Sequence, residues 1–404
     1  MKSWKAALTL IISASFVLSA CGNEELAPAQ SGSETSQPSA TASAPASPSN
    51  SEDAADKEEG GTEAFVSAVK ELVDGMKAGA EAGNVDWAKS QELYNSKIKP
   101  SVEARDAEAE SQVNQQLEAA AAAGKDGSLE PMVVAQIHDK LLQKVAFLTL
   151  RHEFKEANDK FTDKEFVNNE LKEARTVYEG ILKGMVEKRD TAYHTQLLGV
   201  IDSGFAEMEQ AAGKGDNLAY NLGKQLVDKS LMKAFYLASG AEKGYGYKIE
   251  KAVKEGSKDA KVEQAEGWAF FQSLKNYLEE HDKEAADFIE SQFDLANDVK
   301  NVKGEPINQA YVRAFAATAK GEYKETFENW GKDKAAITAL EGALFISVIE
   351  SDLPKALGGE AAAKALIDNA QKLLDQVKAG KKAEAEGTYK AVEADLNKLT
   401  AFGK

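Results

Sequence analysis

Two histidine–carboxylate pairs have a spacing that could bind a metal ion. His152 and Glu156 are four residues apart, and His281 and Glu284 are three apart. In a helix, both spacings place two ligand atoms on one face, as carboxylate–histidine metal sites require. His152 also continues an apolar series that ends at Leu148, so we expect it to be partly buried. The competing interpretation is a surface or capping role, because acidic residues are frequent throughout this chain.

Charged residues inside apolar segments form a second group of candidates. Glu341 and Glu350 flank the apolar run 343–349, and Arg313 lies within the apolar segment 311–315. An isolated buried charge is very costly, so each of these groups must be paired or lie at the edge of the core. A pair between Arg313 and Glu350 would be structural. Several carboxylates that meet without a cation would instead bind one. The sequence leaves both outcomes open.

A short motif, V-E-x-R-D, occurs twice, with Arg105 and Asp106 in one copy and Arg189 and Asp190 in the other. Arginine pairs with carboxylates and other anions in a fixed, two-pronged geometry that lysine cannot reproduce. The two copies could form equivalent sites for an anion or a partner. We favour the alternative, a clasp of salt bridges that joins helices within each copy.

Known catalytic motifs are missing from the sequence. It contains no G-x-S-x-G, no H-E-x-x-H and no phosphate-binding P-loop, and the stretch 244–247 lacks the third glycine of a dinucleotide site. We therefore expect a protein that binds or supports a partner rather than an enzyme, with no cofactor except the metal ion considered above.

The start of the chain has the pattern of an export signal, followed by its only cysteine. Lys2 and Lys5 precede the apolar run 6–17, and the tetrapeptide L-S-A-C ends at Cys21. This start resembles the signal peptide and lipobox of a bacterial lipoprotein. The resemblance implies cleavage before Cys21, a lipid on its sulfur and further acylation, for example with palmitate. Two or more acyl chains make a stable anchor, so we expect the mature protein to be attached to the extracytoplasmic face of the cell membrane.

The charge of the chain restricts its partners. Its formal net charge is −17, and the loss of Lys2 and Lys5 with the signal changes this to −19. Nucleic acid is therefore excluded as an expected partner, whereas a cationic ligand or a basic component of the cell envelope is compatible. With Cys21 lipidated, no disulfide can form, so stability must come from a sizeable core.

Composition divides the chain into four parts. Residues rich in Ser, Ala, Pro and acidic side chains follow the signal and predict a disordered tether. Beyond them, Ala, Leu, Lys and Glu dominate, and apolar residues recur at three- and four-residue steps, which predicts an all-α fold of long amphipathic helices. The predicted parts are a signal (1–20), a lipid-anchored linker (21–62), a helical domain (63–241) and a second helical domain (242–404).

The first helical domain contains an internal duplication, about 70–150 and 155–239. Residues from Tyr94 to Gln112 recur 84 positions later, from Tyr178 to Gln196. A later block that includes Asp139 recurs at a spacing of 89, so we infer a five-residue insertion between the blocks. Glu266-Gly267 is also echoed by Glu341-Gly342. Duplicated helical modules pack their apolar faces together or stack in series.

One further resemblance concerns the segment 83–89, G-N-V-D-W-A-K, which continues to Tyr94, Ile98, Pro100 and Glu103. It is similar to the opening helices of imelysin-like bacterial proteins. That family has a duplicated helical-bundle fold and includes lipoproteins of iron-uptake systems, so the resemblance implies a metal-linked role outside the cytoplasm. The family's G-x-H-x-x-E motif is missing here, so no ligand residue carries over.

These observations lead to one expectation and one alternative. We expect a lipid-anchored, extracytoplasmic helical protein that binds or scaffolds a component of the cell envelope. The alternative is an imelysin-like cation-binding component of metal uptake, in which His152 and Glu156 would be the first ligands to test.

Overall fold

A computed structural model describes residues 61–404. The predicted signal, Cys21 and nearly all of the predicted linker lie outside the described residues. The predicted end of the linker at Thr62 is wrong by two residues, because the first helix already begins at Gly61. The hydroxyl of Thr62 donates to Glu173 Oε2 at 2.7 Å, which ties this helix start to the folded part.

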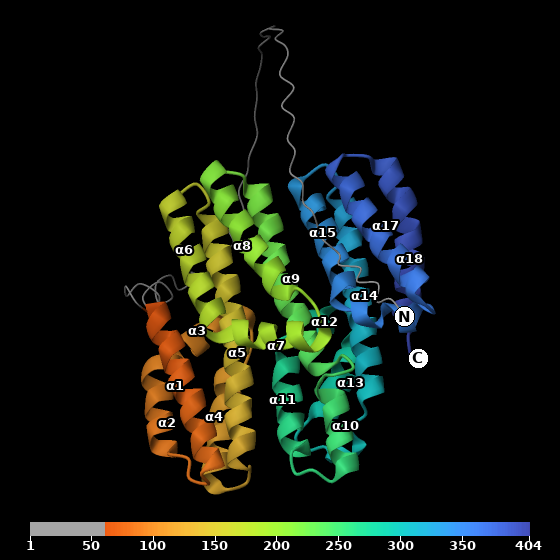
Figure 1. Ribbon diagram of the computed structural model, residues 1–404. Coiled ribbons are helices and arrows are strands. Elements are labelled where there is room, and N and C mark those ends of the chain that lie inside the picture. The colour runs from red at the N-terminus through yellow and green to blue at the C-terminus, as the bar shows by residue number, and fades with distance from the viewer. Residues whose placement is uncertain (1–60) are drawn as a thin grey trace, which may run out of the picture. The chain divides into compact units, whose positions relative to one another are not determined.

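The all-α prediction is confirmed, and residues 61–404 contain no strand (Figure 1). The elements of the duplicated part are α1 (Gly61–Glu81), α2 (Trp87–Leu93), η1 (Tyr94–Ile98), α3 (Lys99–Ala109), α4 (Val113–Asp126), α5 (Pro131–Asp159), α6 (Lys164–Val177), η2 (Tyr178–Leu182), α7 (Lys183–Tyr193), α8 (Leu197–Lys214) and α9 (Asn217–Ser239).

The rest of the chain is equally helical. Its elements are α10 (Tyr245–Glu255), α11 (Ala260–Gln272), α12 (Lys275–His281), α13 (Lys283–Phe293), η3 (Val299–Asn301), α14 (Gly304–Glu328), α15 (Asp333–Val348), η4 (Glu350–Asp352), α16 (Leu353–Leu357), α17 (Glu360–Lys378) and α18 (Lys382–Leu399).

Positions that are 84 residues apart in the predicted repeat have the same local structure. The π-helical turns η1 and η2 begin at Tyr94 and Tyr178, and each leads directly into an 11-residue helix. Those helices are followed by Glu110 and His194, their C-caps, which are the two non-glycine residues with positive φ among residues 61–404 (49° and 57°). Left-handed backbone is unfavourable for such residues, so its recurrence at the same repeat position shows that both copies turn the chain in the same way.

A repeated aspartate holds this turn. Asp106 accepts hydrogen bonds from the Ser111 hydroxyl (2.6 Å) and from the backbone N–H groups of Val113 (2.9 Å) and Asn114 (2.8 Å). These N–H groups lie in the first turn of the next helix and have no partner within it, so the carboxylate caps that helix. Its negative charge also interacts favourably with the positive N-terminal end of the helix dipole. We call this arrangement the aspartate clasp.

The second clasp has the same bonds. Asp190 accepts from the Thr195 hydroxyl (2.7 Å) and from the backbone N–H groups of Leu197 (2.7 Å) and Leu198 (3.0 Å). A clasp was predicted for this motif, but it consists of an aspartate and backbone amides rather than salt bridges.

One hydrophobic core joins the helices from α1 to α18. The long helices α5 and α9 pack against each other; α1, α4, α6 and α11 contact α5, while α8, α11 and α15 contact α9 (Figure 1). Because α11 packs against both, the core is continuous across position 241, where the predicted domains meet. The division into two helical domains stays a prediction.

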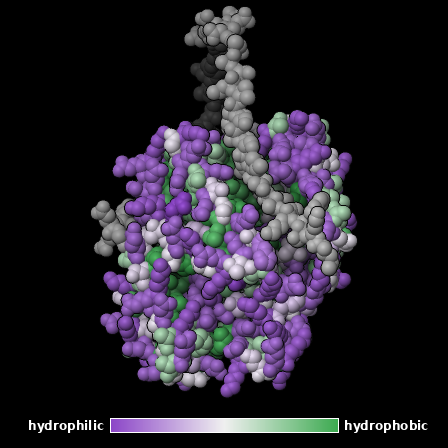
Figure 2. All heavy atoms as spheres, in the orientation of Figure 1, coloured by the Kyte–Doolittle hydropathy of each residue, from purple (hydrophilic) through white to green (hydrophobic). Residues whose placement is uncertain are grey.

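The face of the molecule in Figure 2 is predominantly hydrophilic, with smaller separate hydrophobic areas, as the acidic composition leads one to expect. Within the described residues, no helix combines the length and the apolar character that crossing a membrane requires.

Candidate functional site

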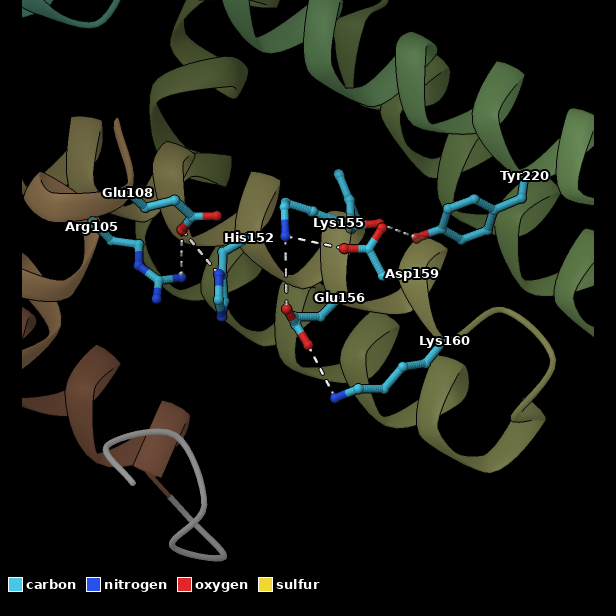
Figure 3. A network of polar contacts seen from close by, with 9 residues as sticks. Arg105, Glu108, His152, Lys155, Glu156, Asp159, Lys160 and Tyr220 are labelled. Carbon is cyan, nitrogen blue, oxygen red and sulfur yellow. Dashed lines mark hydrogen bonds and ion pairs between the residues drawn. The ribbon is translucent and has the colours of Figure 1, made fainter. Parts of the chain in front are cut away.

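The predicted ligand pair His152 and Glu156 lies on α5, but the two side chains contact different partners (Figure 3). His152 Nδ1 is 2.9 Å from Glu108 Oε2, and this hydrogen bond is the main cause that lowers the pKa of Glu108. Glu156 Oε2 accepts instead from Lys160 Nζ at 3.1 Å. Both residues are thus engaged in polar contacts within the helical body, as the competing interpretation expects.

The second pair is separated by a break in the helix, so the prediction of one shared face is wrong. His281 ends α12 and Glu284 lies in the first turn of α13, with Asp282 between them as the N-cap of α13. Among residues 61–404, no group of three or more His, Cys, Asp or Glu side chains is arranged to hold a metal ion. The described residues therefore offer no ligand set for the cation-binding alternative.

Arg313 and Glu350 also have separate partners. Arg313 Nη1 donates to the Phe402 carbonyl at 2.9 Å and so fixes the chain end against α14. Glu350 pairs with Lys233 Nζ at 3.0 Å. The apolar segments therefore place these charges at the edge of the core, where each has its own structural contact.

The arginines of the repeated motif differ in their surroundings. Arg105 is buried on α3, with its Nη1 3.6 Å from Glu108 Oε2. Arg189 is partly exposed on α7, and no carboxylate of residues 61–404 lies within ion-pair distance of it. Its Nε is nevertheless buried without a hydrogen-bond partner in the described part of the chain. Equivalent sequence positions thus differ in the two copies.

The structure also brings together two repeated sets of charges deep in the helical body. In the first set, which we call the open triad, Asp139 and Lys140 on α5 face Glu266 on α11. Asp139 Oδ2 is 2.6 Å from Lys140 Nζ and 2.5 Å from Lys77 Nζ, and Lys140 is 3.5 Å from Glu266 Oε1. Burial would raise the pKa of Asp139, but Lys140 and Lys77 outweigh it and lower this pKa to about 2.

The second set, which we call the sealed triad, consists of Asp228 and Lys229 on α9 and Glu341 on α15. Lys229 Nζ is 2.8 Å from Asp228 Oδ2 and 3.1 Å from Glu341 Oε1. Arg151 donates two hydrogen bonds to the carboxylate of Asp228, from Nε to Oδ1 at 2.6 Å and from Nη2 to Oδ2 at 3.1 Å. The lysines of both triads also lie over phenylalanine rings, of Phe270 and Phe345, which follow Glu266 and Glu341 by four residues.

A cleft of about 350 Å³ opens beside the open triad. Its walls come from α1, α5, η2, α7, α10 and α11. We call it the basic cleft, because five lining side chains are cationic and three are anionic: Lys70, Lys77, Lys140, Lys188 and Arg189 against Asp74, Asp139 and Glu266. A local excess of positive charge in a chain of net charge −17 marks this place as unusual.

Several polar atoms of the basic cleft have no hydrogen-bond partner among residues 61–404. They are Gln136 Oε1, Gln143 Oε1 and Arg189 Nε, all buried. Gln143 is only 6% exposed, and its Nε2 donates to Asp139 Oδ1 at 2.8 Å, so its carbonyl oxygen has a fixed position. A buried polar atom without a partner costs about 1–3 kcal/mol. A ligand that supplied the missing partners would recover this energy, so the cleft is a candidate binding site.

Aromatic rings complete the wall opposite these polar groups. Tyr245 and Phe270 stack with their centroids 5.8 Å apart, and both line the cleft. Burial, and next the carboxylate of Glu266, raise the pKa of the Tyr245 hydroxyl, so the ring stays neutral. Such a wall accepts C–H groups of a ligand.

Sequence reasoning missed most of this site. The repeat of Asp139 and Lys140 and the echo of Glu266 were visible, and an Asp-Lys pair inside the apolar stretch 137–148 was the available signal. Only the fold shows that the two signals belong to one triad. No sequence motif marks Gln143 or Lys188 as part of the site. The sequence also does not reveal the open space beside Gly184.

Comparisons with protein-family models, with curated proteins and with solved structures find no match to this chain. The function must therefore be argued from the site itself.

Proposed function

We propose that the protein is a lipid-anchored, extracytoplasmic binding protein that captures a small ligand in the basic cleft. The lipobox ending at Cys21 supports the location, and the cleft supports the activity. The tether would allow the helical body to sample the space beside the membrane.

The observation that carries this proposal is the set of unpaired polar groups around the cleft. Arg189 lacks an ion pair within residues 61–404, and the carbonyl oxygens of Gln136 and Gln143 lack donors. A merely structural charge cluster satisfies its members, as the sealed triad does. Groups held in place without partners are typical of a site that receives them from a ligand.

The lining residues favour binding over catalysis. They include no serine, threonine, cysteine or histidine, so the cleft offers no side-chain pair of a nucleophile and a general base of the usual kind. Against the effect of burial, Lys140 and Lys77 lower the pKa of Asp139, and a carboxylate in this state is a poor proton donor at neutral pH.

The cleft can be tested by filling it. A side chain added at Gly184 meets no atom within 4 Å and would point into open space at the cleft, so Gly184→Phe should fold normally and occlude the site. Gly199 on α8 is equally open but does not line the cleft, and Gly199→Phe is the matched control.

We expect a compound library of anions, cations and neutral metabolites to contain ligands that raise the Tm of the purified full chain and of Gly199→Phe, but not of Gly184→Phe. A library that raises none of the three melting temperatures would reject the binding proposal. The anchor is tested separately: Cys21→Ala should move the chain from the membrane fraction to the soluble fraction and abolish labelling with a fatty-acid analogue.

A further inference from the structure

We infer that the ligand of the basic cleft is a small, hydroxyl-bearing organic anion, in which a carboxylate or phosphate group is attached to a short polyol chain. This inference rests on the proposed binding function and names the substrate class of the same site.

The anionic end is assigned by the cations of α7. Arg189 and its neighbour Lys188 both line the cleft, and no carboxylate of the described residues is within ion-pair distance of either. Asp190, which follows Arg189 in the sequence, accepts three hydrogen bonds in its clasp, from Thr195, Leu197 and Leu198. Arg189 thus lines the cleft with a buried Nε donor that has no acceptor among residues 61–404, and carboxylate and phosphate oxygens are the acceptors that a guanidinium pairs with most strongly.

The hydroxyl end is assigned by α5. Gln136 and Gln143 are seven residues apart, and so lie on the same face of this helix, and each presents a buried carbonyl oxygen without a donor. These oxygens require O–H or N–H groups. A ligand ammonium group would meet Lys77 and Lys140 around Asp139, both of which already neutralise that carboxylate. Uncharged hydroxyl groups avoid this repulsion, so the site favours a polyol over an amine.

The remaining wall fits the carbon chain. The stacked rings of Tyr245 and Phe270 line the cleft together with Val73 and Met185. This apolar surface can cover the C–H side of a polyol while its hydroxyl groups face α5. A volume of about 350 Å³ is at the small end of the range for ligand pockets, which suits a molecule of sugar-acid size.

The decisive measurement is calorimetric titration of the full chain with three six-carbon compounds. Gluconate carries both the carboxylate and the hydroxyl groups, hexanoate carries only the charge, and glucose only the hydroxyl groups. We expect gluconate to bind at least about tenfold more tightly than the other two. Glucose 6-phosphate tests the second anion, and tight binding of either it or gluconate supports the inference and identifies the acidic group.

Two variants tie the binding to the assigned groups. Arg189→Gln should weaken gluconate or glucose 6-phosphate by at least about tenfold and reduce the dependence on salt. Gln143→Met introduces the residue that the sealed copy has at the matching position, Met232, and should bring the affinity closer to that for hexanoate. Arg175→Gln, at an exposed ion pair on α6, is the control and should leave binding unchanged.

The outcomes separate the two proposals. If neither gluconate nor glucose 6-phosphate binds more tightly than hexanoate and glucose, the inference about the ligand class is overturned. The same holds if a cationic or neutral compound binds tightly and Gly184→Phe abolishes that binding, although the proposed binding function would then stand. Variants are compared only at equal helix content and similar Tm, and Gln143→Met remains an independent test if Arg189→Gln does not fold.

Discussion

The open and sealed triads are two copies of one arrangement with different outcomes. Both consist of an Asp-Lys pair on a central helix and a glutamate on a neighbouring one, and both lysines lie over a phenylalanine ring. In the sealed copy the side chains of Asp228 and Lys229 are only 8% and 2% exposed. In the open copy the side chains of Asp139 and Lys140 are 14% and 11% exposed, and Lys77, which binds Asp139 from α1, is 32% exposed at the cleft.

Arg151 explains much of this difference. Its guanidinium forks onto Asp228 and lies against the rings of Phe147 (4.2 Å) and Tyr277 (4.6 Å), so it fills the space beside the sealed triad. Lys77 makes a single ion pair among residues 61–404, with Asp139, and has no planar group to fill the corresponding space. The comparison shows how the same charged arrangement is closed by an arginine in one copy and left beside an accessible cleft in the other, and the cleft is where we propose that a ligand binds.

The largest expected effect comes from breaking the sealed copy. Arg151→Met leaves the buried Asp228 with Lys229 alone and should lower the free energy of unfolding by about 3 kcal/mol. Lys77→Met removes the corresponding cation from the more exposed open copy and should cost about 1 kcal/mol or less. Urea denaturation at pH 7 measures both, and equal losses would contradict the distinction between the copies.

A second test uses a carboxyl group beside the sealed copy. Burial, and then the charge of Glu341, raise the pKa of Glu322 on α14 to about 8. The folded state therefore holds this proton more tightly than the unfolded state, and the contribution of Glu322 to stability falls as the pH rises from about 4.5 to 8.

Glu322→Gln stays neutral and should gain roughly 2 kcal/mol over the wild type between pH 5 and pH 8. Thermal or urea unfolding across this range checks the gain. Glu328→Gln, at an exposed pair on the same helix, is the control and should show no such trend. A flat difference for Glu322→Gln would mean that the group ionises normally in the fold.

Acid should separate the two aspartates. Because the pKa of Asp139 is lowered to about 2, its contribution to stability is complete above its unfolded pKa of about 3.9 and is lost as the pH falls toward 2. The advantage of the wild type over Asp139→Asn should therefore shrink by roughly 2 kcal/mol between pH 5 and pH 2.

Asp228→Asn is the matched variant of the sealed copy. Burial opposes ionisation of Asp228, but Arg151 and Lys229 outweigh it and hold its pKa well below the usual range. Its advantage over Asn should persist to lower pH than that of Asp139. Loss of both advantages in the same pH interval would show that the copies are electrostatically equivalent.

The smallest effect should come from a feature that the two copies share. Asp106→Asn and Asp190→Asn each replace one accepting oxygen by an amide NH₂ group, which cannot accept from the backbone N–H donors. Each substitution should lower the free energy of unfolding by about 1 kcal/mol, measured in urea. Similar losses are expected because the two clasps have the same bonds. A loss several times larger in one variant would show that only that copy depends on its clasp.

Much of the fold was predictable because its signals are local or repeated. Helical spacing of apolar residues follows from the geometry of the helix itself. The repeat was predicted because residues from Tyr94 onward recur 84 positions later, from Tyr178 onward. The π-helical turns were not predicted, since no residue type marks them. The pair His281–Glu284 was misjudged because Asp282 starts a new helix there, a break that the i, i+3 spacing alone does not reveal.

The sequence by itself determined the all-α class and predicted the duplication and the export signal, because each depends on neighbours along the chain. Only the tertiary structure decided which charges meet. Asp139 and Glu266 are brought together by the packing of α5 against α11, and Arg151 reaches Asp228 from another helix. Whether a repeated charge is sealed or accessible depends on the side chains that other helices place around it, and this information is distributed over distant positions of the chain.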